Sequence, residues 1–162
     1  MVTVEIVIKI DMESAMVNVT SVRQKDPLWQ ALMEYARDCT WRAGPLLAQQ
    51  MEKNLFQDFE RVFAATYEGE IAGYCTFQKT DCIPNVPYTP YISFVFVGEA
   101  YRGQRISQLM ICHVLAYAKT AGFDKVYLVS GEQGLYEKYG FVKLEEKMDH
   151  WGRVEQIFCI DT

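Results

Sequence analysis

The strongest candidate for chemistry in this chain is the stretch Val95–Tyr117, where an apolar segment leads through a short basic loop directly into a long helical pattern. The first turn of a helix has backbone N–H groups without intrahelical partners, and the helix dipole adds about half a positive charge there. A diphosphate could therefore bind on that turn, with Arg102 and Arg105 closing over it. The same residues also fit an ordinary strand–turn–helix with two solvated arginines, and by themselves they favour neither interpretation.

The other polar residues favour no second kind of catalytic centre. The sequence has no G-x-S-x-G or Cys–His pattern for a covalent nucleophile, and no His, Cys and carboxylate cluster with metal spacing. His113 falls on the apolar face of the predicted long helix, which indicates a buried core residue, and His150 falls in a predicted turn. We therefore expect no metal site and no covalent enzyme intermediate.

Length, charge and cysteine usage limit the class of protein. The chain has 162 residues, half of them hydrophobic, which suits one domain over residues 1–162. Its formal net charge of −5 argues against nucleic acid as the main partner. The five cysteines are scattered and form no C-x-x-C pair, which indicates reduced thiols in a cytoplasmic protein. The apolar run Val4–Ile10 is too short and too charged for a signal peptide or a membrane span, so no membrane partner is expected.

The elements that would hold the basic loop begin with a strand and two helices. Val2–Ile10 is β-branched and alternates, which predicts a strand, while Val17–Val22 could be a second short strand or a loop. Pro27–Arg37 has an apolar helical face with proline at a likely first position, and Gly44–Asn54 has the spacing of a second helix.

Strands dominate the middle of the chain. Arg61–Tyr67 and Ile71–Lys79 flank a Glu-Gly turn, which predicts a hairpin. Asp81–Pro90 contains three prolines and is predicted to be a loop. Tyr91–Val97 is apolar on both faces except at Ser93, as expected of a central strand.

The long helix follows the basic loop and ends at Gly122. Its predicted buried stripe consists of Ile106, Leu109, Met110, His113 and Tyr117. Lys125–Val129 predicts another buried strand, and Ser130 is expected to begin a short helix because Gln133 stands at the capping-box spacing.

The C-terminal segments Val142–Met148 and Val154–Ile160 predict a closing antiparallel pair. Together the elements predict an α/β (α+β) fold, with a mixed, mostly antiparallel central sheet flanked by helices.

Two motifs, placed in this sequence of strands and helices, resemble motifs of the GNAT superfamily of N-acetyltransferases. The loop Tyr101–Ser107 is similar to its acyl-CoA signature of Arg or Gln, two residues, Gly, one residue, then Gly or Ala. Arg102 matches the first position, whereas Arg105 stands where Gly is usual and Ser107 where Gly or Ala is usual. About thirty residues later, Gly134–Phe141 is similar to the family's L-Y-E-K-x-G-F segment. The resemblance is good from Tyr91 onward and weaker back to about Trp41.

The resemblance implies an enzyme that moves an acetyl group from acetyl-CoA to a primary amine by direct transfer in a ternary complex. The acceptor would be a small-molecule or peptide amine, and a homodimer is compatible with the sequence. The strand Tyr91–Val97 would splay from its neighbour, and its exposed backbone groups would pair with the pantetheine arm. The residues expected to bind the co-substrate are Phe96, Val97, Arg102, Gly103, Gln104, Arg105, Ile106 and Ser107.

Tyr136 is the general acid that the resemblance implies. Thiols titrate near ~8.5 and tyrosine near ~10, so full proton transfer to the departing thiolate is uphill by roughly 2 kcal/mol. We therefore expect a hydrogen bond to the sulfur, with the proton following as charge develops. For the base, Asp81 is the first candidate and Glu99 the second, with Glu132 a weaker third.

Acceptor specificity is expected from the N-terminal helices and the Asp81–Pro90 loop. The aromatic residues there fit a pocket and a core equally well, and in the helices core is favoured. They are Trp29, Tyr35, Trp41 and Tyr88.

Arg105 raises a conformational question, because a non-glycine residue at positive φ costs roughly 1–2 kcal/mol. We favour the interpretation that the family's glycine at this position only lets the backbone approach a phosphate closely. Arg105 would then avoid positive φ and turn its side chain outward.

Two other functions fit parts of the sequence. One is a non-catalytic acyl-CoA-binding or regulatory module with the same fold, which the altered glycine positions leave open. The other is a nucleotide-binding α/β protein, but the chain lacks both G-x-x-x-x-G-K-[ST] and G-x-G-x-x-G.

Overall fold

The computed structural model describes residues 16–162, and the predicted strand Val2–Ile10 lies outside them. The described residues form one seven-stranded sheet in the order β1-β2-β3-β4-β5-β7-β6. The strands are β1 (Val17–Val22), β2 (Arg61–Tyr67), β3 (Glu70–Gln78), β4 (Tyr91–Val97), β5 (Lys125–Ser130), β6 (Val142–Met148) and β7 (Val154–Asp161). The helices are α1 (Leu28–Asp38), α2 (Gly44–Glu52), the short 3-10 helix η2 (Glu99–Tyr101), α3 (Ile106–Thr120) and α4 (Leu135–Lys138).

The sheet is mixed and mostly antiparallel, as predicted. Every neighbouring pair of described strands is antiparallel except β4 with β5, which are parallel. Val17–Val22, which the sequence left between strand and loop, pairs with β2 along its whole length.

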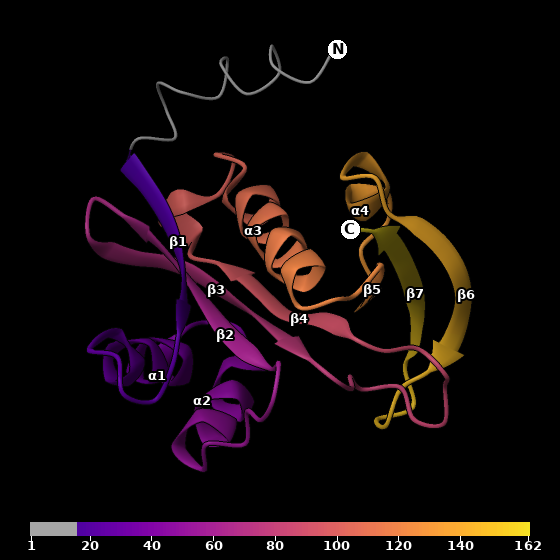
Figure 1. Cartoon of the computed structure of the whole chain (residues 1–162), viewed down its shortest axis with the longest axis horizontal. Coiled ribbons are helices and arrows are strands. Elements are labelled where there is room, and N and C mark those ends of the chain that lie inside the picture. Colours follow the sequence, from indigo (N-terminus) through magenta and orange to yellow (C-terminus); the bar gives the residue numbers. More distant parts are fainter. Residues whose placement is uncertain (1–15) are drawn as a thin grey trace.

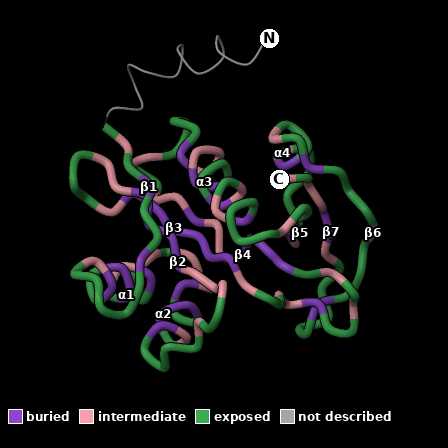
Figure 2. Tube along the Cα trace, viewed as in Figure 1, coloured by how far each residue is buried: buried purple, intermediate pink, exposed green. Residues whose placement is uncertain are grey.

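The helices cover the two faces of the sheet and form two apolar cores (Figure 1). On one face, α1 and α2 pack their buried Leu32, Leu47 and Met51 against β2–β4. On the other face, α3 packs Met110 and Val114 against residues from both halves of the sheet. Burial is accordingly concentrated in β2–β4, while the edge strand β6 is mostly exposed (Figure 2).

Helix α3 is rotated relative to the predicted stripe. Its fully buried positions are Ile106, Met110, Ile111, Val114 and Ala118. The predicted core residue His113 is exposed, so that interpretation was wrong. The error has a simple origin, because apolar residues occur almost all round this helix and two overlapping stripes satisfy the 3.6-residue period.

The expected helix start at Ser130 was also wrong. Ser130 ends β5, and α4 begins only at Leu135, after Gly134 in a left-handed conformation with φ of 80°. The Ser130 hydroxyl accepts a hydrogen bond from the backbone N–H of Glu132 at 3.0 Å. This local turn uses the same side-chain chemistry as a helix cap without starting a helix.

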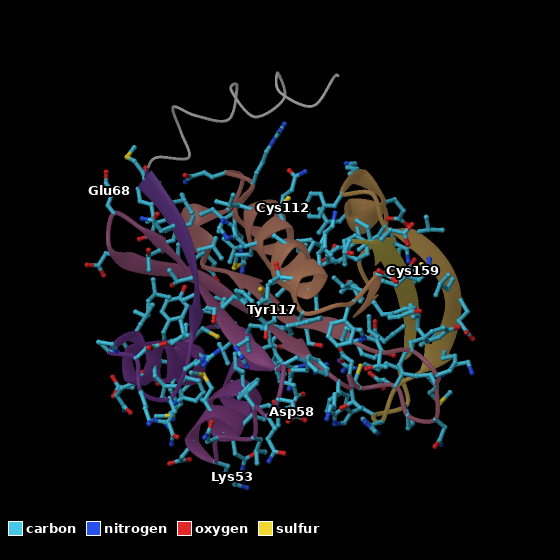
Figure 3. All side chains as sticks on the ribbon, viewed as in Figure 1. Lys53, Asp58, Glu68, Cys112, Tyr117 and Cys159 are labelled. Atoms are coloured by element: carbon cyan, nitrogen blue, oxygen red, sulfur yellow. The ribbon has the colours of Figure 1, made fainter. Side chains whose placement is uncertain are left out.

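The five cysteines are free thiols. Cys112 on α3 and Cys159 on β7 illustrate their distribution over separate elements (Figure 3). Among residues 16–162, no helix combines the length and apolarity that crossing a bilayer requires.

The feature that matters for function is the separation of β4 from β5. These strands pair at only two positions, Tyr91 with Tyr127 and Ile92 with Leu128. Beyond Ile92 the edge of β4 that faces β5 has no strand partner among the described residues. The central sheet is therefore split from this point onward, as the resemblance implied.

Candidate active site

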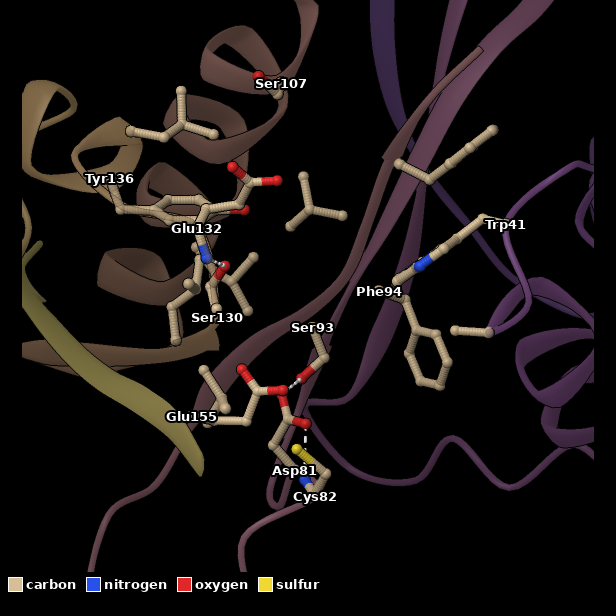
Figure 4. A pocket seen from close by; sticks show the side chains of 18 of the residues that line it. Trp41, Asp81, Cys82, Ser93, Phe94, Ser107, Ser130, Glu132, Tyr136 and Glu155 are labelled. Atoms are coloured by element: carbon tan, nitrogen blue, oxygen red, sulfur yellow. Dashed lines mark hydrogen bonds between the residues drawn. The ribbon is translucent and has the colours of Figure 1, made fainter. Parts of the chain in front are cut away.

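A cleft of about 1190 Å³ opens where β4 and β5 separate. Figure 4 shows Tyr136, Glu132 and Ser130 on one wall and Trp41 and Phe94 on the opposite wall. Residues from the described loop after β3 and from β7 complete the lining. The cleft thus joins a strand edge, a helix start and several titratable side chains.

One end of the cleft lies at the start of α3. Leu109 N–H donates to the carbonyl of Arg105 at 3.0 Å, which closes the first helical turn. The N–H groups of the preceding residues in that turn have no intrahelical acceptor. Gly103 and Arg105 have φ of 82° and 60°, and turn conformations of this kind can direct successive N–H groups toward a common centre. This geometry suits a diphosphate.

Arg105 itself adopts the left-handed conformation, with φ of 60° and ψ of 26°. The expectation that this position avoids positive φ was therefore wrong. Glycine is usual at this position because it adopts positive φ without strain. Arginine adopts the same conformation at a cost of roughly 1–2 kcal/mol. Its side chain is exposed, as expected of an outward-turned arginine.

Arg102 folds back over β4. Its Nε donates to the carbonyl of Val97 at 3.0 Å, and its guanidinium lies 5.7 Å from the centroid of the Phe96 ring. The Phe96 ring also stacks with the Trp41 ring, with centroids 5.9 Å apart and an angle of 3° between the ring planes. Arg102 therefore sits at the cleft, beside the β4 backbone that is expected to hold the pantetheine arm.

A bulge in β4 changes the direction of this backbone. The register with β3 shifts between Tyr74 and Thr76, and Phe94 has φ of 50°. A bulky residue at positive φ is a strained conformation that surrounding structure must hold in place. The bulge re-aims the following β4 residues and lies directly at the cleft.

Tyr136 lies on the opposite wall, where its side chain is buried against Phe141 and Phe158. Burial raises the pKa of its hydroxyl, and the negative charge of Glu132 adds to the rise. The hydroxyl is therefore protonated at neutral pH and can donate a hydrogen bond. Tyr139 packs edge-on against Tyr136 and shares a hydrogen bond with the Ser107 hydroxyl at 3.0 Å, so it ties α4 to the start of α3.

Asp81 lies in the lining of the cleft. Its Oδ1 accepts the backbone N–H of Cys82 at 2.6 Å, and its Oδ2 accepts the Ser93 hydroxyl at 2.5 Å (Figure 4). Burial raises the pKa of this carboxyl, although the hydrogen bonds from Ser93 and Cys82 and the nearby His150 oppose the rise. A carboxyl with a raised pKa is a stronger base than an ordinary aspartate.

Three other carboxylates line the cleft. Glu99 is exposed on η2 and accepts the Thr40 hydroxyl at 2.9 Å. Glu132 is exposed beside Tyr136, and Glu155 of β7 is half-buried near Asp81 (Figure 4). Asp81 is the candidate among them that combines burial with a raised pKa.

The four aromatic residues proposed for an acceptor pocket separate in the structure. Trp41 lines the cleft, whereas Trp29 is buried in the core beneath α1. Tyr35 packs edge-on against Tyr74 in the same core. Tyr88 contacts the Tyr127 ring and donates to Glu145, outside the cleft lining.

The structure brings most of the predicted site together. Phe96, Val97, Arg102, Ser107, Tyr136, Asp81 and Glu99 line the cleft. Gly103, Gln104, Arg105 and Ile106 belong to the adjoining loop and helix start, and the Ile106 side chain is buried in the core.

Sequence reasoning missed Ser93 and Glu155. Ser93 was noticed as the polar interruption of an apolar strand, and that interruption was the available signal. Glu155 carried no such signal in the sequence, because a glutamate in a strand with alternating polar and apolar residues is typical of a solvated face.

Comparisons with known proteins agree with this geometry. A family model described as "Acetyltransferase (GNAT) family" matches residues 28–141. No curated protein matches the chain. A GNAT family acetyltransferase from Elizabethkingia anophelis with acetyl-CoA bound is 17% identical, with a TM-score of 0.64 over 91% of this chain and 99% of that one.

Two further solved structures are equally similar in fold. An aminoglycoside 6'-N-acetyltransferase complexed with coenzyme A is 15% identical, with a TM-score of 0.65 over 89% of this chain and 96% of that one. A variant of the spermidine N-acetyltransferase SpeG from Vibrio cholerae is 12% identical, with a TM-score of 0.65 over 91% and 94%.

Proposed function

The chain belongs to the GNAT family of acetyltransferases, and on that premise we propose that it is an N-acetyltransferase that moves the acetyl group of acetyl-CoA directly to a primary amine. The observation that carries this proposal is the split between β4 and β5, which leads to the open first turn of α3 and has Tyr136 and Asp81 in its walls. One continuous cleft thereby offers a site for a long co-substrate and a separate approach for an acceptor.

The residues present fit acetyl-CoA. The N–H groups around Gly103–Ser107 suit the diphosphate, and the unpaired β4 edge from Ser93 to Val97 suits the amides of the pantetheine arm. Arg102 would add a charge contact at the cleft. When bound, the co-substrate supplies an activated thioester.

Asp81 would take the proton of the acceptor amine. A lysine-like amine with a pKa near ~10.4 needs about 4.6 kcal/mol to be neutral at pH 7. The raised pKa of Asp81 reduces the difference between the pKa of the base and the pKa of the amine. The ammonium proton passes to the Asp81 carboxylate, and the neutral nitrogen bonds to the carbonyl carbon as the carbon–sulfur bond breaks. The second nitrogen proton then passes to the departing thiolate, so the products are the amide and the free thiol.

Tyr136 would stabilise the departing sulfur. Because burial raises its pKa, full proton transfer from this hydroxyl is even less favourable than for an ordinary tyrosine. A hydrogen bond that strengthens as charge develops is therefore its proposed role.

The acceptor is proposed to be a small-molecule amine. Trp41 and Phe94 give this part of the cleft an aromatic wall, and Asp81 and Glu155 give it negative charge (Figure 4). Two of the structural neighbours are named for aminoglycoside and spermidine acetyl transfer, which supports this class of acceptor.

The test is acetyl-CoA turnover across a panel of amines, followed by the release of free thiol. We expect Tyr136→Phe to lower kcat by about 100-fold or more, with little change in acetyl-CoA affinity. Tyr117→Phe is the matched control, because its hydroxyl donates to the Phe59 carbonyl and lies outside the cleft lining.

Two results would contradict the proposal. Equal kcat in wild type and Tyr136→Phe would remove the tyrosine from the mechanism. Thermal stabilisation by acetyl-CoA without thiol release from any amine would instead support a non-catalytic acyl-CoA-binding module.

A further inference from the structure

Ser93 is an isolated polar residue inside an apolar strand. It occupies the middle of β4, and only 6% of its surface is exposed. A buried hydroxyl without a hydrogen-bond partner is costly, and Ser93 satisfies this requirement by donating to Asp81 Oδ2 at 2.5 Å. The short distance is typical of a hydroxyl bound to a charged oxygen.

We propose that Ser93 is a positioning residue, whose hydroxyl fixes the Asp81 carboxylate from the rigid central strand so that its remaining lone pair faces the acceptor amine. This inference rests on the proposed function, in which Asp81 is the base. In this arrangement the Ser93 hydroxyl acts through Asp81, whereas the Ser93 backbone belongs to the β4 edge proposed for the pantetheine arm.

The argument begins with the backbone that carries the base. Asp81 lies in the irregular segment between β3 and β4, so the backbone around it is not held by a strand ladder. The hydrogen bond from Cys82 is local, because the donor is the next residue along the chain. The bond from Ser93 links the carboxylate to a central strand, and it therefore sets the direction of the carboxylate relative to the cleft.

Hydrogen-bond capacity leads to the same role. An ionised carboxylate has about four acceptor positions on its two oxygens. Each oxygen of Asp81 already accepts one bond from described residues, one from Ser93 and one from Cys82. With the Cys82 thiol as a third donor, about one acceptor position remains for an amine proton.

Other groups around Asp81 also influence its charge. His150, from the turn between β6 and β7, favours the ionised form. The Cys82 thiol has a pKa raised to about 12, mainly by burial, and is neutral at physiological pH. The Tyr91 hydroxyl on β4 is neutral too, because burial raises its pKa, and Glu155 on β7 contributes negative charge to the cleft. Ser93 donates to the carboxylate from a central strand, and the thiol of the neighbouring Cys82 also hydrogen-bonds the carboxylate.

The decisive measurement is the ratio of kcat/KM in Ser93→Ala to that in wild type as a function of pH. Taking the ratio cancels the ionisation of the acceptor amine. Losing a donor to the ionised carboxylate raises the Asp81 pKa, so the acidic limb of the profile, where activity rises with pH, should move upward by about one pH unit. We therefore expect the ratio to be lowest, at about 0.1 or below, on the acidic side of the limb, and to rise with pH to a plateau below 1, because the ionised carboxylate is still less well directed.

Control variants separate positioning from folding. Ser93→Thr keeps the hydroxyl and should restore most of the wild-type profile, while Ser93→Cys keeps the volume with a weak donor and should shift the limb in the same direction as Ser93→Ala. Ser21→Ala removes an exposed serine of β1 and should change nothing. A ratio that is constant with pH, or no loss at any pH, would overturn the proposal.

A second readout is independent of turnover. Carboxyl ¹³C NMR can follow the titration of Asp81 directly, with Asp81→Asn assigning the signal. The Asp81 pKa should be higher in Ser93→Ala than in wild type, and an unchanged value would contradict the role of Ser93. If no amine were acetylated, the proposed function would fail while this titration still decided whether Ser93 controls Asp81.

Discussion

Replacing Arg105 by glycine should make the protein more stable, although the change removes a side chain and touches no core residue. Arg105 is the residue before α3, with φ of 60° and ψ of 26°, and its side chain is exposed. A residue with a Cβ pays roughly 1–2 kcal/mol in this conformation. Glycine removes that strain, but its greater conformational freedom stabilises the unfolded chain by about 0.5–1 kcal/mol.

The net gain is about 0.5–1 kcal/mol, which for a chain of this size corresponds to a rise in Tm of about 1–4 °C. The assay is urea unfolding of wild type and Arg105→Gly, in which the midpoint should increase and the m-value should stay unchanged. Thermal unfolding provides the second measurement.

Two controls in the same loop isolate the backbone effect. Arg105→Ala removes the charge and keeps the strain, so its stability should lie within about 0.5 kcal/mol of wild type. Gly103→Ala introduces strain at φ of 82° where an added Cβ meets no atom within 4 Å, and it should destabilise by about 1 kcal/mol. If Arg105→Gly were no more stable than Arg105→Ala, the assignment of strain to this position would be refuted.

Arg105→Ala also tests whether the Arg105 side chain contacts a phosphate of acetyl-CoA, since an unchanged acetyl-CoA affinity would remove this side chain from the binding site. Gly73→Ala should destabilise by about 1–3 kcal/mol in urea unfolding and weaken acetyl-CoA binding, because the added Cβ would lie 2.4 Å from the carbonyl oxygen of Phe96 on β4; wild-type stability would show that β4 gives way easily. For Asp149, burial alone would raise the pKa, but hydrogen bonds from Arg153 and Trp151 lower it, so its contribution to stability is present above the unfolded pKa near ~3.9 and is lost as pH falls through the lower folded value. The difference in urea midpoint between wild type and Asp149→Asn should therefore be larger at pH 6 than at pH 3, and an equal difference at both would contradict this linkage.

The order and type of the regular elements followed from hydrophobic periodicity wherever one face differed clearly from the other. Arg61–Tyr67 and Val142–Met148 occur as strands with the predicted bounds. Periodicity failed on α3, where Val114 and not His113 faces the core, because apolar residues surround most of the helix. The capping-box spacing at Ser130 failed because the Ser130 hydroxyl accepts the N–H of Glu132 in a local turn and starts no helix.

Backbone conformation was the less predictable part of the site. Phe94 and Arg105 adopt positive φ with side chains for which that conformation is strained, so residue type alone argues against it. Such strain depends on contacts between segments distant in sequence, here the β3–β4 register and the start of α3. For the same reason the pairing of Ser93 with Asp81, twelve residues away, became visible only in three dimensions.

The split in the sheet also has a mechanical consequence. The core under α3 contains residues from both sides of the split, such as Ile92 and Leu128, whereas the core under α1 and α2 contains residues from the β1–β4 side only. The core under α3 thus joins the two halves of the sheet, whereas the core under α1 and α2 does not cross the split. A ligand arm with amide groups, bound between β4 and β5, would hydrogen-bond to the β4 edge as a strand does. Binding of the co-substrate would therefore also stiffen the connection between the two halves of the sheet.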